Sequence, residues 1–181
     1  MTRLIALDIA LRVGFAHDGP KAGVPITGVY DCRATSGTAK DGFTLGATFE
    51  SFRRWLIAKI DEVKPWEIAF EAPLHIVGRT MTSQQTVRVL FGLAAMAEAV
   101  AYELDIPIAE GNIVTIKKHF AGSAKADKAA MVARCRQLGW DVGATADHNR
   151  ADAAALWSMA HSLRDPKWAP TSTPLFARVP A

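Results

Sequence analysis

The sequence predicts an α/β domain in which a mixed five-stranded sheet carries helices on both faces. The first 32 residues hold three short apolar runs separated by turn signals, which is typical of an antiparallel meander. Further along, helical spacing alternates with short apolar strands, the pattern of parallel strands joined by helices. Half of the 181 residues are hydrophobic, which is enough for one core. We therefore expect one domain over residues 1–163 and a separate tail over residues 164–181.

The meander is expected to use residues 3–10, 13–17 and 26–32 as strands. A helix should follow at residues 43–63, because large apolar side chains recur there at helical spacing and Lys64-Pro65 ends the pattern. The apolar residues on its expected inner face are Phe49, Phe52, Leu56, Ile60 and Val63.

A buried strand is expected at residues 66–70 and a short one at 106–109. The long helix between them should cover residues 83–104, with Phe91 and Leu93 on its packed side. Three shorter helices are expected at residues 112–120, 126–138 and 148–163. The tail holds four prolines, which favours an extended or disordered segment.

Composition excludes several classes of protein. No apolar run approaches the roughly 20 residues of a membrane span, and Asp8 interrupts the apolar N-terminus, which argues against a secretory signal. Cys32 and Cys135 have no metal-ligand spacing, so we expect two small buried side chains in a reducing cytoplasm. The chain has no P-loop pattern, and no nucleotide cofactor is expected. A net charge of +3 permits an anionic partner without requiring one.

Three carboxylates stand at unusual places. Asp8 interrupts the most apolar strand, Glu71 ends another buried strand, and Asp152 lies among apolar residues of the last helix. Taken singly, they could mark a strand end, the start of a loop and a solvated helix position. If the first and fourth strands are neighbours, however, Asp8 and Glu71 point into one crevice, over which the last helix can bring Asp152.

Such a cluster predicts a metal site. The carboxylates would repel one another and raise one another's pKa values, and a divalent cation removes that conflict. Ligand sets made only of oxygen favour Mg²⁺ or Mn²⁺ over zinc. Two Mg²⁺ ions about 4 Å apart would position an attacking water and stabilise the leaving oxygen of a phosphodiester, and we expect Mn²⁺ to substitute.

The start of the last helix offers a fourth group. His148 shares a helix face with Asp152 and could bind the metal or position a phosphate oxygen. Asp147 is either the N-cap of this helix or, if the helix begins one turn later, a further carboxylate of the site.

Basic residues near these acids are candidates for contacts with DNA. Arg12 follows the first strand, and Arg79 lies in the loop after Glu71. Phosphate backbones are bound by such side chains and by helix N-termini. Ordinary solvated helix ends explain the spacing of the remaining candidates equally well. These are the lysines around Gly122, namely Lys117, Lys118, Lys125 and Lys128.

Four blocks of the sequence resemble the RuvC-type Holliday junction resolvases, and most closely their smaller phage-type relatives. The blocks are LDIALRVGFA, IAFEAP, IVTIKKHFAGSAKADKAAMV and DHNRADAAALW, and the resemblance covers residues 3–163. It implies a ribonuclease H-like fold, a homodimer that uses the helix at 83–104, and nicking of a four-way DNA junction with Mg²⁺ or Mn²⁺. It also implies a cytoplasmic location, in a bacterium or a phage-infected cell.

The resemblance also implies roles for single residues. Asp8, Glu71 and Asp152 match the metal ligands of the family. One turn before its last ligand the family has an acid or a histidine, whereas this chain has Asn149. That role would fall to Asp147, to His148 or to Asn149 itself as a neutral ligand. DNA contacts are implied for Lys117, Lys118 and Lys128.

The leading interpretation is a metal-dependent endonuclease that resolves Holliday junctions. Two alternatives stay open because a fold does not fix a substrate. One is a related ribonuclease H-like nuclease that acts on other branched DNA or on RNA. The other is a catalytically idle protein that binds junctions.

Overall fold

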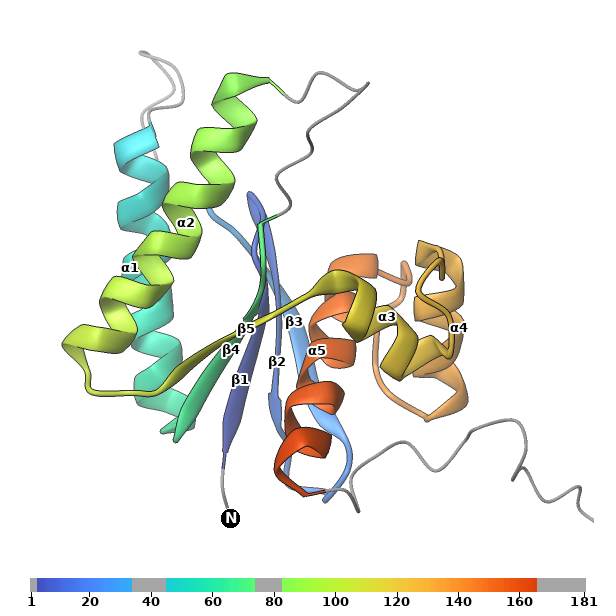
Figure 1. The fold of residues 1–181 in the computed structure, drawn as a ribbon. Helices are drawn as coiled ribbons and strands as arrows, with labels where there is room; N and C mark the ends of the chain where they lie inside the picture. Colours follow the sequence, from blue (N-terminus) through green and yellow to red (C-terminus); the bar gives the residue numbers. More distant parts are fainter. Residues whose placement is uncertain (1–2, 34–44, 74–82, 166–181) are drawn as a thin grey trace, which may run out of the picture.

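A five-stranded mixed sheet forms the middle layer of the molecule, in the strand order β3-β2-β1-β4-β5 (Figure 1). The structure, a computed structural model, describes residues 3–33, 45–73 and 83–165. The strands are β1 (Leu4–Asp8), β2 (Arg12–Asp18), β3 (Pro25–Asp31), β4 (Glu67–Glu71) and β5 (Ile108–Gly111). The first three pair antiparallel, whereas β1, β4 and β5 run parallel. The predicted fold class is therefore confirmed.

Helices cover both faces of the sheet (Figure 1). One face carries α1 (Leu45–Val63) and α2 (Gln84–Glu103). The other carries α5 (His148–Arg164), with α3 (Ile113–Ala121) and α4 (Lys128–Gln137) packed beside it. Each predicted helix and strand is present, with small differences at its ends. No helix in the described part of the chain is long and apolar enough to cross a membrane.

Side chains of β1 alternate between two apolar cores. Ile5 and Leu7 belong to the core beneath α1 and α2, whereas Leu4 and Ala6 belong to the core beneath α5. The alternation continues at the end of the strand, so Asp8 emerges on the α5 face.

Both cysteines are buried within these cores, as the sequence predicts. Cys32 and Cys135 are free thiols with no exposed surface. Burial raises the pKa of each thiol to about 12.

The predicted packed side of α2 is confirmed at Leu93 and wrong at Phe91. Leu93 is buried together with Val89 and Val100, whereas Phe91 is 43% exposed. Apolar residues surround much of this helix, so its sequence leaves the rotation about its axis open, and the position of α1 decides which side is covered.

The last turns of α5 are fastened to the sheet by two pairs of polar side chains. Asp18 accepts a hydrogen bond from the backbone N–H of Leu4 at 2.7 Å, and Nε2 of His161 lies 3.0 Å from its other oxygen. Arg164 donates from Nε to Glu67 at 2.9 Å. Burial opposes ionisation of Asp18, but the hydrogen bonds outweigh burial and hold its pKa below the ordinary value.

Replacing Asp18 tests this fastening. We expect Asp18→Asn to lower the free energy of unfolding at pH 7 by about 1.5–3 kcal/mol, the usual range for a hydrogen bond to a charged group. Because the pKa of Asp18 is depressed in the folded state, its contribution is present above about pH 4 and is lost as the pH falls through the folded pKa. Urea denaturation of both proteins at pH 7 and pH 3 measures this difference.

The exposed pair of Asp61 and Lys64 supplies the control. Asp61→Asn should change stability by less than about 0.5 kcal/mol. An Asp18→Asn protein as stable as the wild type at pH 7 would contradict the expectation.

Candidate active site

The strand register places Asp8 beside Glu71. Leu7 and Phe70 are partners in the parallel ladder, so the next residue of each strand stands at the same edge of the sheet. Both carboxylates follow the alternation onto the face that α5 covers. Their other neighbours in the ladder are glycines, Gly14 beside Asp8 and Gly111 beside Glu71.

These two glycines let α5 come close to the sheet. A Cβ on Gly14 would lie 2.0 Å from the carbonyl oxygen of Asn149, which is backbone and cannot swing away. A Cβ on Gly111 would lie 2.8 Å from Cδ1 of Leu156. The first turns of α5 therefore rest on bare backbone, and the helix brings Asp152 to the two strand ends.

The three carboxylates lie within electrostatic reach of one another. Burial, followed by repulsion from Glu71 and Asp152, raises the pKa of Asp8 well above its ordinary value. Burial and repulsion from Asp152 raise the pKa of Glu71 to about 7. Burial also raises the pKa of Asp152, with Lys117, His148 and Lys128 acting in the opposite direction. The site is therefore an acidic cluster with basic groups around it.

The chemistry of this cluster fits a divalent cation. Its donors are carboxylate oxygens, and within the described residues their side chains have no hydrogen bond or ion pair. Their raised pKa values reflect a repulsion that a cation would relieve. As the side chains stand, no three Asp, Glu, His or Cys residues of the described segments are close enough together to hold a metal ion. The three carboxylates thus lie near one another, but not close enough to bind one ion together.

The structure places Asp147 and Arg12 together at the edge of this cluster. Asp147 is the N-cap of α5, and one of its oxygens accepts a hydrogen bond from the backbone N–H of Asn149 at 2.9 Å. Its other oxygen lies 2.9 Å from Nη2 of Arg12. His148, the first residue of α5, is near enough to Asp152 to act on its pKa.

The predicted basic residues divide into two groups. Lys117 on α3 and Lys128 at the start of α4 lie close enough to the acids to lower their pKa values. Lys118 and Lys125 are exposed and have no resolved influence on the acids. Arg79 lies outside the described residues.

Gly14 and Gly111 shape the candidate site, and neither was singled out from the sequence. A lone glycine in a strand signals close approach of another backbone, and Gly14 carries that signal inside the second predicted strand. The partner of the close approach, Asn149, is identified only by the packing of α5.

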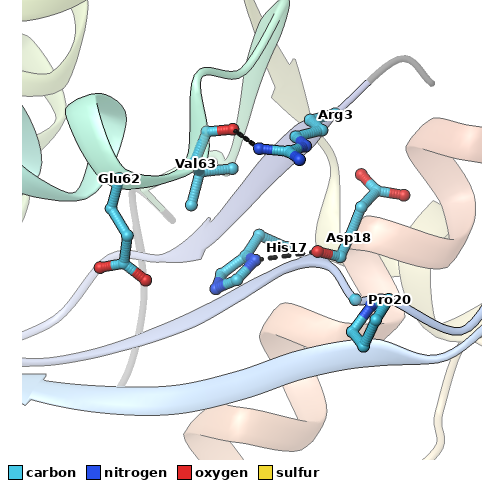
Figure 2. A pocket seen from close by; sticks show the side chains of 7 residues that line it. Arg3, His17, Asp18, Pro20, Glu62 and Val63 are labelled. Carbon is cyan, nitrogen blue, oxygen red and sulfur yellow. Dashed lines mark hydrogen bonds between the residues drawn. The ribbon is translucent and has the colours of Figure 1, made fainter.

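A cavity of about 260 Å³ lies away from the acidic cluster, between the start of β1, the end of β2 and the end of α1. Figure 2 shows the side chains that line it. Its polar groups already have partners. Arg3 donates to the carbonyl of Val63 at 2.9 Å, and Nδ1 of His17 donates to the carbonyl of Asp18 at 3.1 Å. Glu62 pairs with Lys59 at 2.6 Å. The acidic cluster, whose carboxylates lack such partners in the described residues, is the stronger candidate for chemistry.

The strand order and the helix layers define a ribonuclease H-like fold, as the resemblance implies. Among solved structures, this chain is similar to RuvC of Thermus thermophilus. The match has a TM-score of 0.65 and 17% identity, and it covers 90% of this chain and 96% of that chain. The structure of T. thermophilus RuvC in complex with Holliday junction substrate matches with a TM-score of 0.66 and 14% identity over 86% of this chain and 90% of that chain.

A third solved structure is that of the yeast mitochondrial Holliday junction resolvase Ydc2. It matches with a TM-score of 0.62 and 11% identity, over 86% of this chain and 77% of that chain. No protein-family model and no curated protein sequence matches the chain. At these identities the comparisons establish the fold.

The contact at Gly14 can be tested by adding one methyl group. Gly14→Ala must push the first turn of α5 away from β2, so we expect a loss of about 1–3 kcal/mol in the free energy of unfolding, as for other overpacked sites. Chemical denaturation measures it.

Gly46→Ala is the matched control, because no atom of the described residues lies within 4 Å of a Cβ at that position in α1. It should leave stability unchanged or raise it by up to about 1 kcal/mol. Equal stabilities for the two variants would mean that the close approach is not a constraint.

Proposed function

We propose that this protein is an endonuclease that uses a divalent metal to cut branched DNA, with the four-way junction as its substrate. The observation that carries the proposal is the gathering of Asp8, Glu71 and Asp152 at one edge of the sheet. Hydrolysis of a phosphodiester needs a group that balances negative charge at the reacting phosphate. A carboxylate cluster that holds a metal ion, with basic side chains around it, would supply this positive charge.

The comparisons support the choice of substrate. Two of the three similar structures are described as a complex with Holliday junction substrate and as a Holliday junction resolvase. Their chains each match 86% of this chain. The substrate of this chain is thus proposed by analogy of fold, whereas the chemistry is proposed from its own residues.

In this proposal, Asp8, Glu71 and Asp152 hold the metal. Two Mg²⁺ ions, for which Mn²⁺ can substitute, would supply an activated water and charge stabilisation at the leaving oxygen. Glu71 and Asp152 both raise the pKa of Asp8, so Asp8 interacts electrostatically with each of them. It is therefore the side chain on which binding depends most.

The basic residues bind the DNA backbone. Lys117 and Lys128 flank the acids and would hold the phosphate to be cut, while His148 would donate a hydrogen bond to one of its oxygens. Lys118 and Lys125, which are exposed, would contact phosphates further along the strand. Arg79 is proposed for the same role.

Paired cuts on opposing strands need two active sites, which a homodimer supplies. We propose that the two subunits associate through α2, on which Tyr102 is 90% exposed. Sedimentation measures the mass of the assembly.

Asp8→Asn is the decisive variant for the enzyme. Losing about 3 kcal/mol of charge stabilisation would slow cleavage about 100-fold or more, because each 1.36 kcal/mol is a factor of ten. Junction binding should persist, since the lysines that contact DNA are unchanged. The measurement is cleavage of a synthetic four-way junction in Mg²⁺, beside gel-shift binding without metal.

Asp61→Asn, an exposed change on α1, is the control. Asp8→Asn that cuts as fast as the wild type would reject the enzyme. Flap and RNA–DNA hybrid substrates in the same assay decide between junction resolution and the related nuclease activities. Binding without any metal-dependent cutting by the wild type would favour an idle junction-binding protein.

The basic surface predicts a salt dependence. Replacing Lys117 and Lys118 together by alanine should weaken junction binding and reduce the slope of log affinity against log salt by about 2. Fluorescence anisotropy over a range of NaCl concentrations measures both quantities. Mn²⁺ affinity should survive the double substitution, and an unchanged salt slope would count against contact of these lysines with phosphate.

A further inference from the structure

We propose that Arg12 and Asp147 are positioning residues, which hold the first turn of α5 against β2 and so set the place of Asp152 relative to Asp8. The inference rests on the proposed function, because it concerns the same site. It gives the two residues a role different from binding DNA or metal directly.

The side chain of Asp147 is fully engaged. Its Oδ1 accepts from the backbone N–H of Asn149 at 2.9 Å, and its Oδ2 accepts from Nη2 of Arg12 at 2.9 Å. The side chain is only 14% exposed. Both oxygens of this carboxylate therefore help to hold the start of α5 in place, one through the helix cap and the other through the ion pair.

A second hydrogen bond ties the same two elements in the opposite direction. Nδ2 of Asn149 donates to the carbonyl of Arg12 at 3.2 Å. Arg12 is thus joined to the start of α5 through both its side chain and its backbone. Two hydrogen bonds therefore join Arg12 to the start of α5.

These links lie next to the acids. Gly14, two residues after Arg12, is the ladder partner of Asp8 and lies beneath the carbonyl of Asn149. Asp152 follows Asn149 by about one helical turn on the same element. A shift of the first turn of α5 would therefore move Asp152 away from Asp8 directly.

The backbone before the helix needs such a restraint. Ala146 adopts φ +54°, in the left-handed region that disfavours a residue with a side chain. Strained positions of this kind persist where their surroundings over-determine the geometry. The backbone N–H of Asp147, which donates to the carbonyl of Val142 at 2.9 Å, adds to the links through Arg12.

Positioning predicts an effect on metal affinity that exceeds the effect on stability. The side chain of Arg12 is 50% exposed, and half-exposed ion pairs contribute little to folding. Residues that orient metal ligands without touching the metal typically change its affinity by 10–100-fold. The two quantities can therefore be separated by experiment.

The experiment measures Mn²⁺ binding to the full chain without DNA, by the electron paramagnetic resonance signal of free Mn²⁺. Arg12→Met removes the ion pair, and Asp147→Ser removes it while keeping an oxygen for the helix cap. Each should raise the Kd for Mn²⁺ about tenfold. The double variant should be no weaker than either single one, because both changes remove the same contact. Arg12→Lys should restore part of the affinity.

Two controls accompany these variants. Arg53→Met removes an ion pair of the same 2.9 Å length, between α1 and α2 and away from the site, and should leave the Kd for Mn²⁺ unchanged. Thermal unfolding of every variant identifies any loss of folding. If Asp147→Ser fails to fold, Asp147→Asn, which keeps a capping oxygen, replaces it.

Several results would overturn the proposal. Unchanged Mn²⁺ affinity in both single variants would do so. A much larger loss for Asp147→Ser than for Arg12→Met would mean that Asp147 acts on the metal through its own carboxylate, as a ligand or through the negative charge that already acts on Asp8, and not by positioning. Weaker junction binding by Arg12→Met with normal Mn²⁺ affinity would make Arg12 a DNA contact.

Failure of the proposed function gives a different pattern. A wild-type protein that binds Mn²⁺ but cuts no branched DNA would refute the nuclease. The Mn²⁺ affinities of the variants would still test the positioning role. A wild-type protein that binds no Mn²⁺ would refute both.

Discussion

The backbone contact between α5 and β2 at Gly14 is the constraint on which the site depends. A helix normally packs on a sheet through layers of side chains, which keep the two backbones well apart. Here the missing side chain lets the start of the helix reach the strand beside Asp8. Acidic groups from three distant parts of the chain then share one small region, and their burial raises the pKa of each.

The two ends of α5 show opposite uses of charge. At its C-terminal end, Asp18 and Glu67 are each matched by a basic side chain of the helix. At its N-terminal end, the carboxylates of the site face one another without such partners among the described residues. Satisfied pairs anchor the helix, and this anchoring offsets the repulsion at the other end. Functional sites typically contain an unfavourable local interaction, such as this repulsion, which the stability of the rest of the fold tolerates.

The sequence predicted the strands, the helices and the position of Asp8 and Glu71 at the ends of two strands, because these follow from periodicity. Residues 8 and 71 end strands of period two, and strand neighbours share an edge. The sequence left Asp147 open between a cap and a site residue, because the answer depends on the path of the loop before α5 and on Arg12, which is distant along the chain. It misplaced Phe91, because the rotation of α2 is set by what packs against it. Features that depend on tertiary packing in this way leave no signal in the neighbouring sequence.

The buried thiols of Cys32 and Cys135 have a practical consequence. Reaction with maleimides or disulfide reagents requires the thiolate, and with pKa values of about 12 only about one thiol in 10⁵ is ionised at neutral pH. Neither sulfur reaches the surface of the folded protein. A cysteine introduced on the outside of the molecule would therefore accept a fluorophore or a spin label selectively, with both native cysteines left in place.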